Sequence, residues 1–300
     1  MLKRTVLITG ASSGIGKACA LYLAEHNYHV FAGVTNEVSA AKLQPEIDPE
    51  KIEIIIMDVT NENSVQEAFQ VIRDKAPQGL DGVINNAGTV VAAPAELIPV
   101  HEYQRQFDVN YFGMIRVSQM FLPLVRLKKG RIINISSVLG RICIPAHAAY
   151  CSSKFAIKAF TQILRMELKA QEIDVVLIEP GSVRSNIWNV SFDSMEKIFH
   201  NSPESKRKYY THLKEATKKT LHGFAERSID PVKVARVILK ALTVSRPKTH
   251  YMIGWDVKLL NLVGALPERL KERVLFQIMG LSSDSEMIKE VVSTELLLSE

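Results

Sequence analysis

Short apolar runs rich in β-branched residues alternate with stretches of helical periodicity along most of the chain. The periodicity predicts helices around residues 18–23, 63–75, 101–127, 150–169 and 230–243. The apolar runs predict strands at residues 5–9, 29–34, 52–59, 80–84, 131–135, 174–179 and 250–253. Strands that alternate with helices form a parallel sheet covered on both faces, and right-handed crossovers make it doubly wound. We therefore expect an α/β fold in a single domain.

Two segments that follow Pro180 have a different character. Residues 182–228 are polar and partly helical. Ligands of open α/β sheets bind beyond the carboxyl ends of the strands, where this segment begins, so we expect a helical substrate lid, with an ordinary pair of surface helices as the alternative. Residues 259–281 are amphipathic, and we expect them to dock on the body of the protein rather than on another subunit or a membrane surface. Residues 1–255 are thus the main domain and residues 256–300 a helical extension.

The composition is that of a folded globular protein. Hydrophobic residues make up 47% of the chain and charged residues 23%, far from a disordered or fibrous composition. The net charge of +5 is modest, and we interpret the basic clusters at residues 128–131 and 206–208 as solvated surface rather than as a nucleic-acid patch. The sequence therefore does not indicate a nucleic-acid partner.

Cysteine content and the first residues bear on location. Cys19, Cys143 and Cys151 are odd in number and lack metal-ligand spacing, which suits a reducing compartment, so we predict packing roles for them and no metal site. The first strand begins too early to leave room for a signal peptide, and a run of about 18 apolar residues occurs nowhere. We expect a cytoplasmic protein without a transmembrane segment.

A glycine-rich turn joins the first predicted strand to the first predicted helix. Its sequence is Thr9-Gly10-Ala11-Ser12-Ser13-Gly14-Ile15-Gly16. Glycines at such a turn let backbone N–H groups approach a pyrophosphate at the positive end of the helix. The spacing differs slightly from the G-x-G-x-x-G fingerprint, but its position after the first strand indicates the same use. We therefore predict a Rossmann-type dinucleotide-binding sheet.

Tyr150 and Lys154 place a phenol and an ammonium one turn apart on the same face of a predicted helix. A phenol titrates near pH 10 and works as a base at neutral pH only when a cation favours the phenolate. At about 4 Å and an effective dielectric of roughly 20, one positive charge contributes about 4 kcal/mol. We therefore expect Lys154 to lower the pKa of Tyr150 into a working range.

Context separates this pair from a second one with the same spacing, Tyr210 and Lys214. The second pair lies in the polar segment without a preceding strand, and we interpret it as structural. Tyr150 instead follows a strand that ends at Ser136 and Ser137, and the intervening loop can fold these hydroxyls back toward the start of the helix. We predict that a serine there holds the substrate oxygen.

Taken together, these residues resemble the short-chain dehydrogenase/reductase family over roughly residues 3–190. The resemblance rests on Thr9-Gly10-x-x-x-Gly14-x-Gly16, Asn85-Asn86-Ala87-Gly88, Asn110, Ser137 thirteen residues before Tyr150, Tyr150-x-x-x-Lys154 and Pro180-Gly181. It implies an enzyme that passes a hydride between a nicotinamide dinucleotide and an alcohol or carbonyl group.

The resemblance implies roles for four catalytic residues. Ser137 would hydrogen-bond the substrate oxygen, Tyr150 would exchange its proton, and Lys154 would lower the pKa of Tyr150 and bind the nicotinamide ribose. Asn110 would anchor a water that continues the proton relay. Structural roles are the alternatives for three residues: a brace of the sheet for Asn85, a helix irregularity for Asn110 and packing for Ser136.

The same resemblance implies how the dinucleotide is bound. Asp58, at the end of the third predicted strand, resembles the family's adenine-contacting aspartate. Residues 86–88 would line the adenosine side, and Pro180, Gly181 and Val183 would border the nicotinamide. The full set of implied cofactor-binding residues is Gly10, Ser12, Ser13, Gly14, Ile15, Gly16, Thr35, Asp58, Val59, Asn86, Ala87, Gly88, Tyr150, Lys154, Pro180, Gly181, Val183 and Ser185.

The choice between NAD and NADP depends on a few positions. NAD-specific members carry an acidic residue at the end of the second strand, and NADP-specific members carry a basic one there or just before the second glycine. Here those positions hold Val34, Thr35, Asn36 and Ser13, so they do not discriminate. Residues 29–34 resemble a branch with retinol, 17β-hydroxysteroid and 3-hydroxybutyrate dehydrogenases, which are often NAD-linked. NAD(H) is therefore slightly favoured.

The same branch implies a hydrophobic secondary alcohol or ketone as substrate, such as a steroid, a retinoid or a lipid. Apolar residues expected near the pocket agree with this class: Ile142, Ile144, Trp188, Phe192 and Met195. Many steroid and retinol enzymes of the branch have an amino-terminal membrane segment, which this sequence lacks. A soluble reductase of bacterial type therefore fits equally well.

Two alternative functions stay open, a 3-ketoacyl-thioester reductase and a non-catalytic dinucleotide-sensing protein. The intact set of Asn110, Ser137, Tyr150 and Lys154 argues against sensing, because sensing requires none of these groups. Besides a small-molecule alcohol or ketone, we expect further copies of the chain as partners. A homodimer or homotetramer would form through the long helices that start near His101 and Tyr150.

Overall fold

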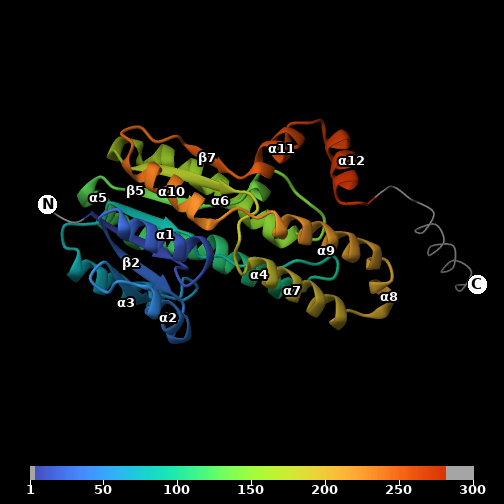
Figure 1. Cartoon of the computed structure of the whole chain (residues 1–300), viewed down its shortest axis with the longest axis horizontal. Coiled ribbons are helices and arrows are strands. Elements are labelled where there is room, and N and C mark those ends of the chain that lie inside the picture. Colours follow the sequence, from blue (N-terminus) through green and yellow to red (C-terminus); the bar gives the residue numbers. More distant parts are fainter. Residues whose placement is uncertain (1–3, 282–300) are drawn as a thin grey trace, which may run out of the picture.

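A seven-stranded parallel sheet forms the centre of the protein (Figure 1). The computed structural model describes residues 4–281. The strands are β1 (Arg4–Thr9), β2 (Tyr28–Val34), β3 (Ile52–Ile56), β4 (Gly82–Asn85), β5 (Arg131–Ile135), β6 (Asp174–Pro180) and β7 (His250–Ile253). Their order, β3-β2-β1-β4-β5-β6-β7, reverses between β1 and β4, where doubly wound sheets bind ligands. The predicted Rossmann-type, doubly wound fold is confirmed.

Helices cover both faces of this sheet (Figure 1). They are α1 (Gly14–Glu25), α2 (Glu37–Leu43), α3 (Glu62–Lys75), α4 (Val100–Phe107), α5 (Gly113–Lys128), α6 (Ala148–Leu168), α7 (Ile187–Asn201), α8 (Glu204–Arg207), α9 (Thr211–Glu226), α10 (Pro231–Thr243), α11 (Trp255–Gly264) and α12 (Glu268–Ile278). In β1, Val6 and Ile8 pack on the side of α1 and α10, whereas Leu7 packs on the side of α3 and α5. Because successive strand side chains point to opposite faces, a strand buried on both faces is apolar throughout.

Strand β3 is shorter than the sequence predicts. It ends at Ile56 rather than at residue 59. Oδ1 of Asp58 accepts hydrogen bonds from the backbone N of Thr60 at 2.9 Å and from its Oγ1 at 2.8 Å. An aspartate that bonds the backbone two residues ahead forms a turn, and the turn ends the strand.

Two expected helical segments are interrupted. The helix expected over residues 101–127 consists of α4, a π-helical segment at Asp108–Phe112, and α5. The amphipathic segment at residues 259–281 forms the separate helices α11 and α12, with Pro267 directly before α12. Proline lacks the N–H that a continuous helix needs, which explains the second break.

The segment at residues 182–228 contains α7, α8 and α9, which extend beyond one end of the sheet (Figure 1). Helices α11 and α12 dock on the body as expected. Leu260 and Leu275 pack with Val138 and Ile142 of the loop between β5 and α6. Residues 282–300 of the expected extension lie outside the described residues. None of the helices within residues 4–281 combines the length and the apolar character needed to span a membrane.

The docking of α12 predicts unequal effects of two leucine truncations on the same helix. Leu275 is 5% exposed and Leu270 is 45% exposed. Leu275→Ala should lower the free energy of unfolding by about 2–5 kcal/mol because it leaves a cavity, and Leu270→Ala should change it by about 0.5 kcal/mol or less. Urea denaturation of both variants measures the difference. Equal effects of the two variants would contradict the docking.

Candidate active site

The glycine turn between β1 and α1 is pressed against two other loops. Gly10 and Gly14 have φ values of +65° and +53°, which favour glycine. A Cβ atom at Gly10 would lie 2.8 Å from Cα of Ala87, and one at Gly14 would lie 2.9 Å from Cβ of Ser185. The turn, the loop after β4 and the loop after β6 therefore meet at the carboxyl end of the sheet.

The start of α1 fits an anionic pyrophosphate. The side chain of Ser13, the N-cap residue, makes no capping hydrogen bond, and the first turn contains no acidic residue. Backbone N–H groups at such a helix start and the positive end of the helix dipole suit a phosphate. The sequence-predicted residues 10–16 thus have the donors that a dinucleotide needs.

The adenosine-side residues follow the neighbouring strands. The side-chain amide of Asn86 donates to the carbonyl oxygens of Thr9 at 2.9 Å and of Gly10 at 3.1 Å, so it fixes the glycine turn. Thr35 is exposed directly after β2, and Val59 is buried beyond the end of β3. Beside Val59, Asp58 bonds Thr60 through Oδ1, and within residues 4–281 its Oδ2 accepts no hydrogen bond. The structure therefore places these predicted residues along one edge of the sheet.

Ser137 and Tyr150 form a pair of hydroxyl groups. Ser137 follows β5 and its Oγ accepts a hydrogen bond from the backbone N of Leu139 at 3.1 Å. Tyr150 lies in the first turn of α6. Burial raises the pKa of the Tyr150 phenol to about 12, and a hydrogen bond with Ser137 opposes this rise. The lowered pKa expected from Lys154 is therefore not found, and Tyr150 is protonated at neutral pH.

Lys154 lies between the end of β5 and the ring of Tyr150. Its Nζ donates to the carbonyl oxygen of Ile135 at 3.1 Å and lies 5.6 Å from the centre of the Tyr150 ring. Burial lowers the pKa of Lys154 to about 8, so the group is still an ammonium at pH 7. Ser136 donates from Oγ to the carbonyl of Lys154 at 3.1 Å, which is the packing role expected for this serine.

Asn110 lies in the π-helical segment, as the alternative reading of a helix irregularity expects. Its Oδ1 accepts a hydrogen bond from the backbone N of Thr89 at 2.8 Å, and its Nδ2 donates to Oγ of Ser153 at 3.1 Å. Ser153 in turn donates to the carbonyl of Tyr150 at 2.8 Å. π-Helical segments occur frequently at functional sites. Asn110 thus connects the loop after β4 to the first turn of α6.

Two other expectations concern structural residues. The side-chain amide of Asn85 donates to Ser118 at 2.9 Å and to Asn134 at 2.8 Å, so Asn85 braces the sheet. In the second tyrosine–lysine pair, the hydroxyl of Tyr210 donates to Glu96 at 2.8 Å, and Lys214 pairs with Glu196 at 2.8 Å. These contacts bear out the structural interpretation of the pair.

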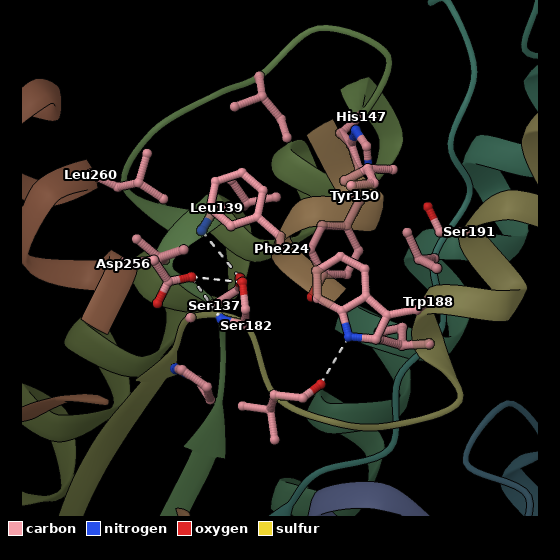
Figure 2. Close-up of a pocket in the computed structure, with 18 of the residues that line it drawn as sticks. Ser137, Leu139, His147, Tyr150, Ser182, Trp188, Ser191, Phe224, Asp256 and Leu260 are labelled. Atoms are coloured by element: carbon pink, nitrogen blue, oxygen red, sulfur yellow. Dashed lines mark hydrogen bonds between the residues drawn. The ribbon is translucent and has the colours of Figure 1, made fainter. Parts of the chain in front are cut away.

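A cavity of about 160 Å³ opens in front of Tyr150 (Figure 2). Ile15 of the glycine turn, Ser137 and the loop after β6 line one part of it. The other walls come from α7, from α9 and from the carboxyl-terminal helices, through Ile187, Trp188, Ser191, Leu221, Phe224, Leu260, Leu275, Ile278 and Met279. Most of these side chains are apolar. None of the sequence motifs described above predicts that α11 and α12 line the cavity.

Three of the five apolar residues expected near the pocket do not line it, whereas Ile144 and Trp188 do. Ile142 packs with α11, the Phe192 ring stacks on His222 at 4.3 Å, and Met195 packs with two alanines. In a helix, only residues on one face can reach a cavity, so Phe192 and Met195 point elsewhere than Trp188.

Two buried polar residues of the site were missed by sequence reasoning. His147 lies one turn before Tyr150, a spacing that could have revealed it. Its Nδ1 lies 3.2 Å from the carbonyl oxygen of Pro145, and burial lowers its pKa to about 4. Asp256 of α11 accepts hydrogen bonds at Oδ2 from the N and Oγ of Ser182, at 2.8 Å and 2.7 Å.

The expectation that all three cysteines are packing residues is wrong for Cys143. Cys19 and Cys151 are buried, but Cys143 is exposed. A hydrogen bond from the Cys151 thiol lowers the pKa of Cys143 to about 7. The loop that carries Cys143 is on the surface beside α12, which hydrophobic patterning does not show.

The buried His147 predicts a specific dependence of stability on pH. The pKa of His147 is about 4 in the folded protein and near 6.5 when unfolded, so its contribution is complete above pH 6.5 and is lost as pH falls toward 4. The loss amounts to about 3 kcal/mol. Free energies of unfolding measured from pH 7 to pH 4 should fall less steeply in His147→Gln than in the wild type, whereas the exposed His200→Gln should follow the wild type. Equal slopes for all three proteins would contradict a buried neutral ring.

Fold and site together define a class of protein. The glycine turn fits a dinucleotide, and beside it a phenol and a hydroxyl line a cavity, with a buried ammonium group next to the phenol ring. These are the parts of a dinucleotide-dependent oxidoreductase.

Comparison with known proteins supports this class. A sequence model of the family described as short chain dehydrogenase matches residues 4–196. The chain is 36% identical to 3-amino-tetrahydro-pyrrolizinone reductase of Xenorhabdus hominickii, over 86% of this chain and 89% of that protein. It is 34% identical to retinol dehydrogenase 7 of Mus musculus, over 90% and 87% of the two chains. It is 35% identical to estradiol 17-beta-dehydrogenase 2 of Rattus norvegicus, over 84% and 68%.

Solved structures show the same fold. A short-chain dehydrogenase from Streptomyces avermitilis superposes with a TM-score of 0.75 at 23% identity, over 95% of this chain and 99% of that one. One from Burkholderia phymatum, in complex with NAD, has a TM-score of 0.70 at 18% identity, over 96% and 95%. One from Burkholderia cenocepacia, in complex with NADP, has a TM-score of 0.68 at 21% identity, over 91% and 96%.

The chain belongs to the short-chain dehydrogenase family, as the motifs predicted. It is an oxidoreductase that acts on CH–OH groups with a nicotinamide dinucleotide.

Proposed function

We propose that the protein interconverts a hydrophobic secondary alcohol and its ketone, with Tyr150 as the general acid and base. The observation that carries this proposal is that the hydroxyl-bearing side chains of Ser137 and Tyr150 both line a mostly apolar cavity. Ile15 and the loop after β6 line the same cavity, so a dinucleotide held at the glycine turn can reach it. A bound nicotinamide would supply or accept the hydride.

In the direction of reduction, the two hydroxyls act on the carbonyl oxygen. Ser137 donates a hydrogen bond that holds this oxygen, and Tyr150 donates its proton as negative charge develops there. The high pKa of Tyr150 suits an acid at neutral pH. In the direction of oxidation the phenolate is needed, and Ser137 is the neighbour that lowers the pKa of Tyr150. Asn110 holds Ser153 and the loop after β4 in place for this exchange.

The residues that enclose the cavity support a hydrophobic substrate. Trp188 of α7, Phe224 of α9 and Leu260 of α11 contribute large apolar surfaces. The names of three relatives, a pyrrolizinone reductase, a retinol dehydrogenase and an estradiol dehydrogenase, refer to ring-containing alcohols or ketones. We infer that residues 182–228 act as the substrate lid and that the helical extension at residues 256–281 completes the pocket.

We infer that NAD(H) is preferred over NADP(H). The residues at the ends of β2 and β3, positions 34–37 and 57–60, contain no lysine or arginine but contain Glu37 and Asp58. Lys17 of α1 is paired with Glu46 at 2.9 Å. A 2′-phosphate at these strand ends would therefore meet negative charge without an evident cation.

We also infer a homodimer or homotetramer in the cytoplasm. The long helices α5 and α6 are expected to form the interface. Large apolar side chains are exposed on these helices and at the residue directly before α5: Phe112, Leu127, Phe155, Ile163 and Met166. Exposed apolar side chains on these helices favour association between copies of the chain.

Tyr150→Phe tests the catalytic assignment. The variant should bind the dinucleotide as the wild type does, but its kcat should fall by about 10²–10⁴ because the transferable proton is lost. Tyr210→Phe, in the second tyrosine–lysine pair, is the matched control and should keep its kcat. The assay follows absorbance of the reduced nicotinamide with steroids, retinoids and aliphatic ketones. An unchanged kcat in Tyr150→Phe would refute the mechanism.

Thr35→Arg tests the coenzyme assignment. An arginine at this exposed position should raise the ratio of kcat/KM for NADP over NAD by about tenfold, because it provides a charged hydrogen bond to the 2′-phosphate. The exposed Gln66→Arg on α3 makes the same change in charge away from the strand end and should leave the ratio unchanged. The same ratio in both variants would show that the adenosine pocket lies elsewhere.

A further inference from the structure

Two of the polar side chains that line the cavity lie together on one side of it and have no part in the proposed reaction. They are His147 and Ser191, and both are 3% exposed. His147 directly precedes α6, and Ser191 lies on α7. Figure 2 shows both residues on the opposite side of the cavity from Asp256 and Leu260. A buried polar group without a partner is costly, so such residues indicate a ligand group.

The protonation of His147 determines what it offers to the cavity. Burial keeps the ring neutral at physiological pH because its pKa is lowered to about 4. Its Nδ1 lies 3.2 Å from the carbonyl oxygen of Pro145, which can only accept a hydrogen bond. The proton of the neutral ring is therefore on Nδ1, and Nε2 carries a lone pair that accepts. Among the described residues, none donates a hydrogen bond to this Nε2.

Ser191 has an unused hydroxyl. Serines inside helices usually bond a carbonyl of the preceding turn. Ser194, on the same helix, follows this rule and donates to the carbonyl of Ser191 at 2.9 Å. The Oγ of Ser191 is buried and has no hydrogen-bond partner within the described part of the chain. Its hydroxyl can both donate to and accept from a ligand.

Packing brings the two side chains to the same region. Met195 lies one turn after Ser191 on α7, and it packs with Ala146, the neighbour of His147. Residues four apart share a helix face, so Ser191 lies on the face of α7 that meets this loop. Ala146 has a φ of +61°, unusual for alanine, and its carbonyl accepts a hydrogen bond from the N of Ala93 at 2.9 Å. The loop is thus held in a strained conformation that fixes His147.

We propose that His147 and Ser191 form a polar subsite that binds a hydrogen-bond donor, a hydroxyl or an amine, on a carbon next to the reacting carbonyl. The donor would give its hydrogen to Nε2 of His147 and would interact with Oγ of Ser191. We place the donor near the reacting oxygen because His147, directly before α6, and Tyr150, in the first turn of α6, line the same cavity. This inference rests on the proposed function and narrows its substrate to α-hydroxy or α-amino ketones.

Four ketones with the same ring test the subsite. They are acetophenone, α-hydroxyacetophenone, α-aminoacetophenone and α-methoxyacetophenone. The methoxy compound keeps the oxygen and its electronic effect on the carbonyl but has no hydrogen to donate. The wild type should show a kcat/KM for the hydroxy or the amino ketone about tenfold to a hundredfold above that for the methoxy ketone. Comparison of the hydroxy and amino compounds identifies which donor the subsite takes.

Binding is measured independently of turnover. The chain has two tryptophans, and Trp188 lines the cavity. In a Trp255→Phe background, fluorescence of Trp188 reports the affinity for each ketone.

His147→Phe should remove the preference for donor-bearing ketones in both assays, and His147→Gln, which keeps an acceptor, should restore part of this preference. Ser191→Ala should reduce the preference and serves as the second variant if a change at His147 impairs folding. The control is His200→Phe at an exposed position of α7, and this variant should keep the preference for donor-bearing ketones.

The outcomes separate the two proposals. Equal affinity of the wild type for the hydroxy, amino and methoxy ketones would overturn the subsite, whatever the turnover. Preference that persists in both His147→Phe and Ser191→Ala would overturn it as well. Preferential binding without any reduction would support the subsite and contradict the proposed function.

Discussion

The site depends on one buried contact between β5 and α6. The ammonium of Lys154 in α6 donates to the carbonyl oxygen of Ile135 at the end of β5, and Ser136 donates back to the carbonyl of Lys154. Because Ser137 follows Ser136 and Tyr150 lies one turn before Lys154, this contact also sets the position of the two hydroxyl-bearing side chains that line the cavity. Burial of the ammonium has a cost in free energy, which is visible in its pKa of about 8.

Burial sets the pKa values of Tyr150 and Lys154 at the site. The apolar surroundings that raise the pKa of Tyr150 keep the phenol protonated, as a proton donor must be. The same surroundings strengthen electrostatic interactions with Lys154. Three separate segments, α7, α9 and the carboxyl-terminal helices, contribute walls of the cavity. Asp256 joins the last of these to the loop after β6 through Ser182.

Local patterns predicted much of this architecture. All seven strands follow from apolar runs, because a parallel sheet is buried on both faces. The glycine turn was predictable because a positive φ and close backbone approach both require glycine at Gly10 and Gly14. A predicted strand precedes Tyr150 but not Tyr210, and this difference distinguished the two tyrosine–lysine pairs. The hydrogen bond of Tyr210 and the ion pair of Lys214 agree with that distinction.

Features that depend on tertiary contacts were not predictable in the same way. The pKa of Tyr150 is set by burial, so spacing to Lys154 gave the wrong direction. The neutral ring of His147 depends on one carbonyl and on the surrounding packing, neither of which the sequence shows. Leu275 lines the cavity because Pro267 interrupts the last amphipathic segment, so that α12 folds back onto the body of the protein. Long-range contacts of this kind leave no periodic signal.

Hydride transfer to a carbonyl carbon is the central claim, and isotope labelling tests it most directly. A ketone that the enzyme reduces is incubated with NADH deuterated on the transferred position of nicotinamide C4, and the alcohol is analysed by mass spectrometry and NMR. Hydride transfer from the nicotinamide should place one deuterium on the carbinol carbon and none on the neighbouring carbons. An alcohol without deuterium on that carbon, or deuterium that enters only from solvent, would contradict it.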